Sequence, residues 1–277
     1  MAHRKNSTAR RRGVAPVMGT VISPDGTAIG YESVGTGPPM LLVHGSTGTR
    51  ARWSAVMPAL AQRYTVYAMD RRGRGLSTTE AKPYSLAREA EDVAAVAEAA
   101  GGNVYVLGHS YGALAVLEAS LIAHAFRRMM LYEPPIPTPG LDIASADSIA
   151  RITTMSDPRQ VLEVFYRETL QLPHSDVKDL ASHEFSYVAD SIRHTAGREL
   201  AQASVYRVTE RHAKICVPVR MLLGSESPAY LRAATAALAD CIPGATIVTL
   251  GGQGHQAIDY DPEQFVRAVL DFDPDRG

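Results

Sequence analysis

The chain has 277 residues, enough for one large domain or for one domain with an inserted segment, since domains usually have roughly 100–200 residues. Hydrophobic residues make up 45% and charged residues 21%, near the averages of globular proteins, so the chain can bury a full core. The formal net charge of −1 argues against a dedicated nucleic-acid binder, which would show a basic surplus.

The cysteines and the apolar runs indicate where the protein works. Cys216 and Cys241 are too few for a disulfide framework and are interpreted as free thiols in a reducing compartment, which favours the cytoplasm. No uncharged apolar run reaches the ~18 residues needed to span a bilayer. Residues 1–16 are basic and lack the apolar core of a secretory signal, so we expect a disordered tail there and no membrane or nucleic-acid partner.

Strand and helix patterns alternate through the first half of the chain. Residues 17–22 and 29–34 flank Pro24-Asp25-Gly26-Thr27, a turn signal, and are predicted to form a β-hairpin. Repeated β–α units follow, which pack as a parallel sheet covered by helices on both faces. The predicted strands are 40–43, 65–69, 104–107 and 129–132, and the predicted helices are 50–63, 86–100 and 112–123.

The pattern changes after residue 133. Four prolines between 134 and 139 break regular structure, and residues 141–212 show helical patterns only. The earlier rhythm then resumes with strands at 219–223 and 246–250 and helices at 229–239 and 262–270. The sequence therefore predicts an α/β core domain over 17–133 and 213–277, with a helical cap inserted at 134–212.

Gly108-His109-Ser110-Tyr111-Gly112 is a G-x-S-x-G motif between a β-rich run and an apolar helix. Three matching residues are a weak signal alone, but this strand–turn–helix setting is the one that a nucleophile elbow requires. The sharp turn would expose the Ser110 hydroxyl above the carboxyl ends of the strands, where open α/β sheets bind ligands. An ordinary glycine-rich loop is the alternative.

Four segments, in this order, resemble the landmarks of the α/β-hydrolase fold family. They are Leu41-Leu42-Val43-His44-Gly45-Ser46, Asp70-Arg71-Arg72-Gly73-Arg74-Gly75, the motif around Ser110, and a late Gly254-His255. The resemblance covers nearly everything from residue 17 to residue 270. It implies an α/β fold with a mostly parallel eight-stranded sheet, helices on both faces and a helical cap inserted after the sixth strand.

The resemblance also implies a catalytic triad. A serine hydroxyl is a poor nucleophile unless a base removes its proton, and histidine titrates near neutral pH. In this family the chain order is serine, acid, histidine, and His255 fits it best, in a glycine-rich loop after the last predicted strand. A surface-loop histidine is the alternative. His109 is expected to pack inward, and His44 is expected to be structural.

The triad carboxylate departs from the common family pattern. The usual aspartate position after the next-to-last strand is Ser227 here, which carries no charge, and Glu226 stands one residue before it. A second family location follows the sixth strand, where this chain has Glu133. The spacing along the chain between Ser110 and Glu133 resembles the spacing in one subset of this family. That subset includes zearalenone-lactonase-like hydrolases and some haloalkane dehalogenases. Glu133 is the predicted acid, and Glu226 is the alternative. If Glu133 has only a structural role, we expect it to form a salt bridge at the base of the cap.

An oxyanion hole needs two backbone N–H groups aimed at the developing negative charge. The predicted donors are Tyr111, directly after the nucleophile, and Ser46, in the loop after His44-Gly45. Several aromatic residues are candidates for an apolar substrate pocket, although each also suits core packing. They are Trp53, Phe165, Tyr166, Phe185 and Tyr187.

Two other kinds of site are not expected. The run at 70–75 lacks the Gly-Lys-Ser/Thr ending of a phosphate-binding loop and is interpreted as a structural turn. No cluster of His, Cys, Asp or Glu has the spacing of metal ligands, so we predict no metal and no cofactor.

Together these features predict a serine hydrolase that cleaves a carboxylic ester or lactone of a medium-sized hydrophobic substrate through an acyl-enzyme. The expected partner is a small-molecule substrate, and the sequence leaves open whether the protein is a monomer or a homodimer. Members of this fold also act as cofactor-free haloperoxidases, oxygenases or lyases, and a slow-turnover ligand receptor is a third class, so these remain alternatives.

Overall fold

The computed structural model describes residues 15–78, 80–81, 83–173, 176–177, 185–186 and 188–272. Its central feature is an eight-stranded sheet in the order β1-β2-β4-β3-β5-β6-β7-β8. The β1–β2 and β2–β4 pairs are antiparallel and all other neighbours are parallel, as predicted. The strands are β1 (Val17–Ile22), β2 (Ala28–Val34), β3 (Pro39–Val43), β4 (Thr65–Met69), β5 (Val104–His109), β6 (Phe126–Tyr132), β7 (Val219–Gly224) and β8 (Thr246–Leu250).

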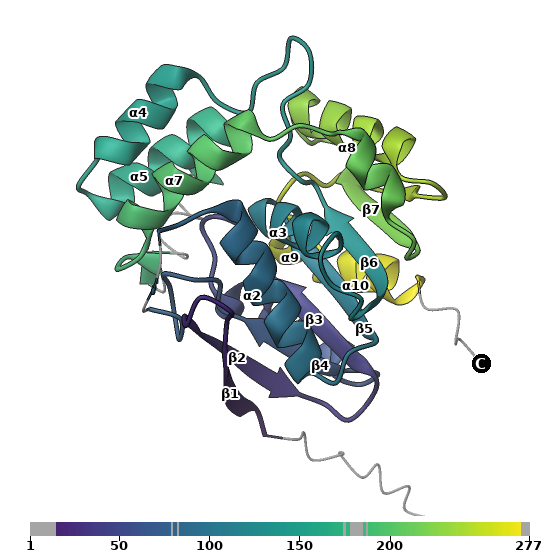
Figure 1. The fold of residues 1–277 in the computed structure, drawn as a ribbon. Helices are drawn as coiled ribbons and strands as arrows, with labels where there is room; N and C mark the ends of the chain where they lie inside the picture. The colour runs from purple at the N-terminus through teal and green to yellow at the C-terminus, as the bar shows by residue number, and fades with distance from the viewer. Residues whose placement is uncertain are drawn as a thin grey trace, which may run out of the picture.

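Helices cover both faces of this sheet (Figure 1). One face packs against α2 (Leu86–Ala99), α3 (Tyr111–Ala119) and α8 (Ala229–Cys241). The other face packs against η1 (Arg50–Trp53), α1 (Met57–Leu60), α9 (Ala257–Tyr260) and α10 (Pro262–Leu270). The predicted two-faced α/β fold is confirmed.

The strands are apolar on both sides because both sides are buried. Leu41 and Val43 of β3 join the core that contains α2 and α3, whereas Met40 and Leu42 join the core on the opposite face. Successive side chains of a strand point to opposite faces, so a short continuous apolar run serves two cores at once.

The helix predicted at 50–63 is divided in the structure. Residues 50–53 form the 3₁₀ helix η1, and the α-helix α1 begins only at Met57. Pro58 lies in the first turn of α1, and proline has no N–H to donate to the preceding turn. A single helix through this position would lose that hydrogen bond, so the chain turns and restarts.

Between β6 and β7 the chain forms a group of helices at the upper left of Figure 1, set apart from the sheet. We call α4, α5, η2 and α7 the helical insertion. The side chains of Ser145 and Asp157 accept hydrogen bonds from the first turns of α4 and α5, as N-caps do. The bounds are α4 (Ala146–Thr154), α5 (Pro158–Val164), the π-helical turn η2 (Phe165–Thr169) and α7 (Ile192–Val205), followed by the 3₁₀ helix η3 (Glu210–Lys214).

The chain ends and the cysteines complete the description. The tail predicted at 1–16 falls almost wholly on residues 1–14, which lie outside the described residues. Cys216 and Cys241 are free cysteines. Within the described ranges, no helix combines the length and the apolar character needed to cross a bilayer.

Candidate active site

Ser110 occupies the turn between β5 and α3, where its backbone is strained. Its φ of 55° and ψ of −125° put a non-glycine residue in a conformation that costs about 1–3 kcal/mol. Two hydrogen bonds hold the turn: Ser110 N–H donates to the Tyr132 carbonyl at 2.8 Å, and Ala113 N–H donates to the Ser110 carbonyl at 2.8 Å. Strain that the surroundings maintain in this way is typical of functional sites.

Both glycines of the motif are required by close backbone contacts. A Cβ on Gly108 would lie 2.6 Å from the Cα of Ala113, and one on Gly112 would lie 2.3 Å from the carbonyl oxygen of His44. Real Cβ atoms essentially never come so close to backbone atoms. Strand β5, helix α3 and the loop after β3 can therefore meet only because these positions lack side chains.

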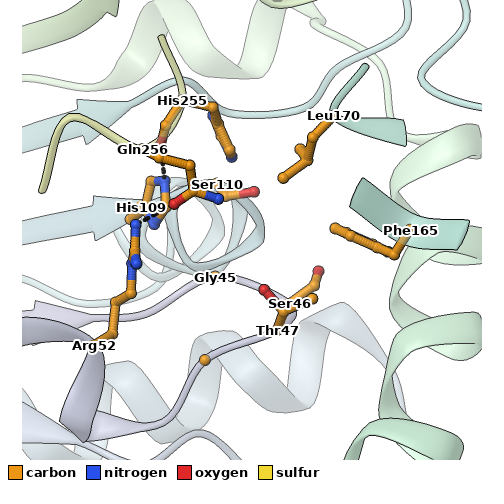
Figure 2. Close-up of a pocket in the computed structure, with 11 residues that line it drawn as sticks. Gly45, Ser46, Thr47, Arg52, His109, Ser110, Phe165, Leu170, His255 and Gln256 are labelled. Carbon is orange, nitrogen blue, oxygen red and sulfur yellow. Dashed lines mark hydrogen bonds between the residues drawn. The ribbon is translucent and has the colours of Figure 1, made fainter. Parts of the chain in front are cut away.

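The His255 side chain lies in the loop after β8 and contacts Glu133. Its Nδ1 lies 2.5 Å from Oε2 of Glu133, and the residue is 3% exposed. Nε2 of His109 donates to the His255 carbonyl at 3.1 Å, and the Tyr132 hydroxyl donates to the Gly254 carbonyl. In Figure 2 the His255 ring extends toward the side chain of Ser110. Neighbouring elements thus hold the histidine loop above the serine turn.

Glu133 follows β6 and is fully buried, with a positive φ of 49°. Its Oε1 accepts from the backbone N–H of Gly224 at 2.7 Å and from the Ser227 hydroxyl, while Oε2 faces His255. A carboxylate oxygen accepts hydrogen bonds, so Nδ1 of His255 is the donor in this contact.

Glu226, the alternative acid, lies at the surface. Its carboxylate accepts from the Ser225 hydroxyl at 2.9 Å, and its side chain is exposed. The neighbouring Ser227 is the residue that turns inward and contacts Glu133. Among the contacts of the described residues, Glu133 and not Glu226 is the carboxylate that meets His255.

The loop after β3 lies against the serine. A Cβ on Gly45 would come within 2.9 Å of the Ser110 Cβ, so the Gly45–Ser46 backbone passes directly beside Ser110. The side chain of His44 supports this loop: Nδ1 donates to the Gly45 carbonyl at 2.8 Å, and Nε2 accepts from Arg71 N–H at 3.1 Å. Burial and the nearby arginine charges lower the pKa of His44 well below its usual value, which keeps the ring neutral for these two roles.

A small pocket lies beside Ser110 and His255. Figure 2 shows Phe165 and Leu170, both from the segment between β6 and β7, facing Ser110 across it. The complete lining is Gly45, Ser46, Thr47, Gly48, Arg52, His109, Ser110, Phe165, Leu170, His255 and Gln256. Of the described residues suggested for an apolar pocket, Phe165 is the one in this lining.

The other aromatic candidates lie elsewhere or outside the described part. Trp53 is fully buried, and the centroid of its ring lies 6.5 Å from the centroid of the His109 ring. The buried Tyr166 donates to the Thr47 hydroxyl at 3.4 Å. Phe185 lies 3.9 Å beneath the Arg159 guanidinium group, and Tyr187 lies outside the described residues.

Apart from Ser46, Ser110, Phe165 and His255, the lining residues had no role in the pocket expected from the sequence. They are Gly45, Thr47, Gly48, Arg52, His109, Leu170 and Gln256. Arg52 is 5% exposed and pairs with Asp259 and with the Gln256 side chain. Both partners are far from Arg52 in the sequence. Gln256 directly follows His255 in the sequence, and this position is the one sequence signal that could have indicated its place in the pocket. Among the described residues, no group of three or more His, Cys, Asp or Glu is placed to hold a metal ion.

Comparison with known proteins now identifies the class. A sequence profile described as the alpha/beta hydrolase family matches residues 40–268, and the chain belongs to this family. One relative is a 2-(acetamidomethylene)succinate hydrolase of Mesorhizobium japonicum, 27% identical over 247 residues, 86% of this chain and 88% of the relative.

Solved structures agree with this assignment. An alpha/beta hydrolase from Sphaerobacter thermophilus superposes with a TM-score of 0.79 at 31% identity, over 92% of this chain and 99% of the other. The esterase RhEst1 from Rhodococcus superposes with a TM-score of 0.75 at 27% identity, over 92% of this chain and 98% of the other. These three relatives are hydrolases, which supports hydrolase activity on a small molecule for this chain.

Proposed function

We propose that this protein is a serine hydrolase that cleaves a carboxylic ester or lactone of a medium-sized hydrophobic substrate. Ser110 Oγ attacks the substrate carbonyl while His255 Nε2 takes the hydroxyl proton. The N–H groups of Ser46 and Tyr111 stabilise the tetrahedral oxyanion. His255 then protonates the leaving oxygen, and a water that it deprotonates hydrolyses the acyl-enzyme.

The observation that supports this mechanism best is the 2.5 Å contact between His255 and Glu133, both buried beside the Ser110 turn. A carboxylate on Nδ1 selects the tautomer whose Nε2 can accept the serine proton, and it stabilises the imidazolium that forms. The close approach of Gly45 to Ser110 supports the Ser46 N–H as an oxyanion donor.

We further propose that the segment 134–212 acts as a cap on the core formed by 17–133 and 213–277. Phe165 and Leu170 come from this segment and form the apolar side of the pocket, whereas the polar side comes from the core. Apolar walls with a few placed polar groups suit an uncharged acyl substrate.

A second candidate is cleavage of an amide by the same acyl-transfer steps. It is favoured by the 2-(acetamidomethylene)succinate hydrolase, whose named substrate contains an acetamido group. The esterase RhEst1, at the same 27% identity, favours the ester. Ester and amide hydrolysis differ in the leaving group that His255 must protonate, so the same residues serve both.

A matched pair of substrates distinguishes these reactions. p-Nitrophenyl butyrate and the p-nitroanilide of butyric acid share an acyl group, and butyrolactone tests ring opening. We expect the wild type to hydrolyse the ester and Ser110→Ala to lose this activity, with a fluorophosphonate probe labelling only the wild type. Faster turnover of the anilide would select the amide. If no substrate turns over and Ser110 is not labelled, the proposed function is wrong.

A further inference from the structure

The loop after β3 rests on two buried arginines that the proposed reaction does not use. Arg71 and Arg74, in the turn after β4, are 0% and 1% exposed. Nη1 of Arg71 donates to the carbonyls of His44 at 3.3 Å and Gly45 at 3.1 Å. Nη1 of Arg74 donates to the Ser46 carbonyl at 2.6 Å. Three consecutive carbonyls of this loop are therefore held by guanidinium groups.

The carbonyl of Gly45 receives the most donors. Besides Arg71, it accepts from His44 Nδ1 at 2.8 Å, and Nη1 of Arg74 lies 3.5 Å away. In a trans peptide the C=O and N–H groups point in opposite directions, so the donors that hold Gly45 O also aim the N–H of Ser46. A hydrogen bond to the carbonyl end of a peptide also polarises the group and strengthens its N–H as a donor.

Two buried carboxylates balance these cations and connect them to distant helices. Glu89 of α2 accepts from Nε of Arg71 at 3.0 Å and from its Nη2 at 2.7 Å. Glu199 of α7 is fully buried, lies 2.9 Å from Nη2 of Arg71 and also pairs with Arg74. One of the two counter-charges therefore comes from the helical insertion.

Arg71 also contacts the residue that would supply the second oxyanion donor. Its guanidinium group lies 4.7 Å above the centroid of the Tyr111 ring, a cation–π geometry. The Tyr111 hydroxyl in turn accepts from the Tyr84 hydroxyl at 2.6 Å. The Arg71 side chain thus touches the backbone of the loop after β3 and the side-chain ring of Tyr111, the residue directly after Ser110.

We propose that Arg71 is a positioning residue of the oxyanion hole, that Arg74 assists it, and that Glu199 couples this arrangement to helix α7. The role rests on the proposed serine mechanism, because it concerns the N–H groups that would receive the oxyanion. Arg71 does not touch the substrate; it acts through the Gly45–Ser46 peptide and the Tyr111 ring.

Arg72 provides a matched control within the same turn. It is equally buried, and it forms ion pairs with Asp92 at 2.7 Å and Asp25 at 3.0 Å. Within the described residues, its guanidinium group donates to Asp92, Asp25 and the Arg88 carbonyl, and these partners all lie outside the loop at 44–48. Lysine has one nitrogen in place of the planar fork, so it cannot hold two carbonyls and two carboxylates at once.

The test compares Arg71→Lys with Arg72→Lys on the ester that the wild type hydrolyses best. We expect Arg71→Lys to lower kcat about 100-fold with KM changed less than about threefold, because the lost contribution acts in the transition state. Phenylboronic acid, which forms a tetrahedral adduct on serine, should inhibit this variant more weakly by a similar factor. Arg72→Lys should lose stability but keep its kcat and its inhibition constant.

Glu199→Gln retains the size and one acceptor oxygen and is the second variant if Arg71→Lys does not fold. We expect its kcat to fall about tenfold, again with little change in KM. Equal kcat losses in Arg71→Lys and Arg72→Lys, or a wild-type kcat in either Arg71→Lys or Glu199→Gln, would overturn the proposal. An unlabelled, inactive wild type would instead refute the proposed serine mechanism, so the two failures are distinguishable.

Discussion

Glu133 and Ser227 share the place that usually holds a single aspartate in the resembled family. Ser227 stands at that usual position and donates its hydroxyl to Oε1 of Glu133, which enters from the end of the neighbouring strand β6. Strands β6 and β7 pair in parallel, so their carboxyl ends meet at one edge of the sheet. A carboxylate can therefore reach His255 from either strand end, and the chain uses the earlier one.

Exchanging each candidate acid for its amide tests this arrangement. Glu133→Gln should lower kcat by about 10³–10⁴-fold, because the amide cannot stabilise the imidazolium or select its tautomer. Steady-state kinetics on the preferred ester measures the effect. Glu226→Gln is the matched control and should behave as wild type, since its carboxylate lies at the surface. The reverse result would assign the acid to Glu226.

The Ser227 hydroxyl should contribute to stability through its hydrogen bond to a buried carboxylate. In Ser227→Ala, Oε1 of Glu133 keeps the Gly224 N–H as a donor but loses the hydroxyl. This loss should lower the unfolding free energy by about 1–3 kcal/mol. Urea unfolding measures it. Ser225→Ala, which removes a hydroxyl that contacts the exposed Glu226, should stay within about 0.5 kcal/mol of wild type. Equal values for both variants would contradict the contact.

At the scale of elements, the strand–turn–helix unit of β5 and α3 depends on backbone proximity more than on helix propensity. Gly112 lies in the first turn of α3, where alanine would be favoured by about 1 kcal/mol if the helix were isolated. A Cβ there would meet the carbonyl oxygens of both Val43 and His44, at 2.4 and 2.3 Å. The packing of α3 against the end of β3 overrides the local preference.

Gly112→Ala should therefore destabilise the protein by about 3 kcal/mol or more, or prevent its folding, although alanine is the better helix former. Soluble yield and urea unfolding give the measurement. Gly251→Ala serves as control, because a Cβ there meets nothing within 4 Å and its φ is not in the left-handed region. A stable and active Gly112→Ala variant would show that α3 can move away from β3.

At the scale of the whole molecule, the fold keeps several ionisable groups in its interior. The arginines of the turn after β4 are paired with carboxylates, whereas His44 and His109 are buried as neutral rings. Burial lowers the pKa of both histidines well below the usual value. A buried neutral histidine makes the unfolding free energy depend on pH near neutrality.

The direction of that pH dependence follows from proton binding. Below about pH 6.5 the unfolded chain protonates these histidines and the native protein does not, so the unfolding free energy falls as the pH falls. Each histidine contributes up to about 1.4 kcal/mol per pH unit, and the contribution is complete above pH 6.5. Burial raises the pKa of Asp92 to about 6, which acts in the opposite direction, so a comparison of variants is needed.

Urea unfolding at several pH values between 7.5 and 5 isolates the histidine contribution. His109→Gln should reduce the pH slope by about 1.4 kcal/mol per unit relative to wild type. His124→Gln changes an exposed histidine and should leave the slope unchanged. If the His109→Gln slope equals that of the wild type, the native ring takes up a proton as readily as the unfolded chain.

Much of the fold followed from local pattern. Apolar runs bounded by turn residues located each strand, and the change of pattern after residue 133 located the segment that forms the helical insertion. The helix at 50–63 was predicted too long because helical spacing continued through Pro58, where the chain restarts. At the site, the motif, the chain order and the position after β6 predict Ser110, His255 and Glu133.

The sequence by itself determined the kind and order of the elements, because strand and helix periodicities and turn residues act over a few neighbours. Only the tertiary structure decided which distant residues meet. It brought Ser227 to Glu133, Arg52 to Asp259, and Glu199 to the arginines beneath the loop at 44–48. The physical reason is that a parallel sheet gathers the ends of distant strands at one edge, and the pairing of buried polar groups there has no period along the chain.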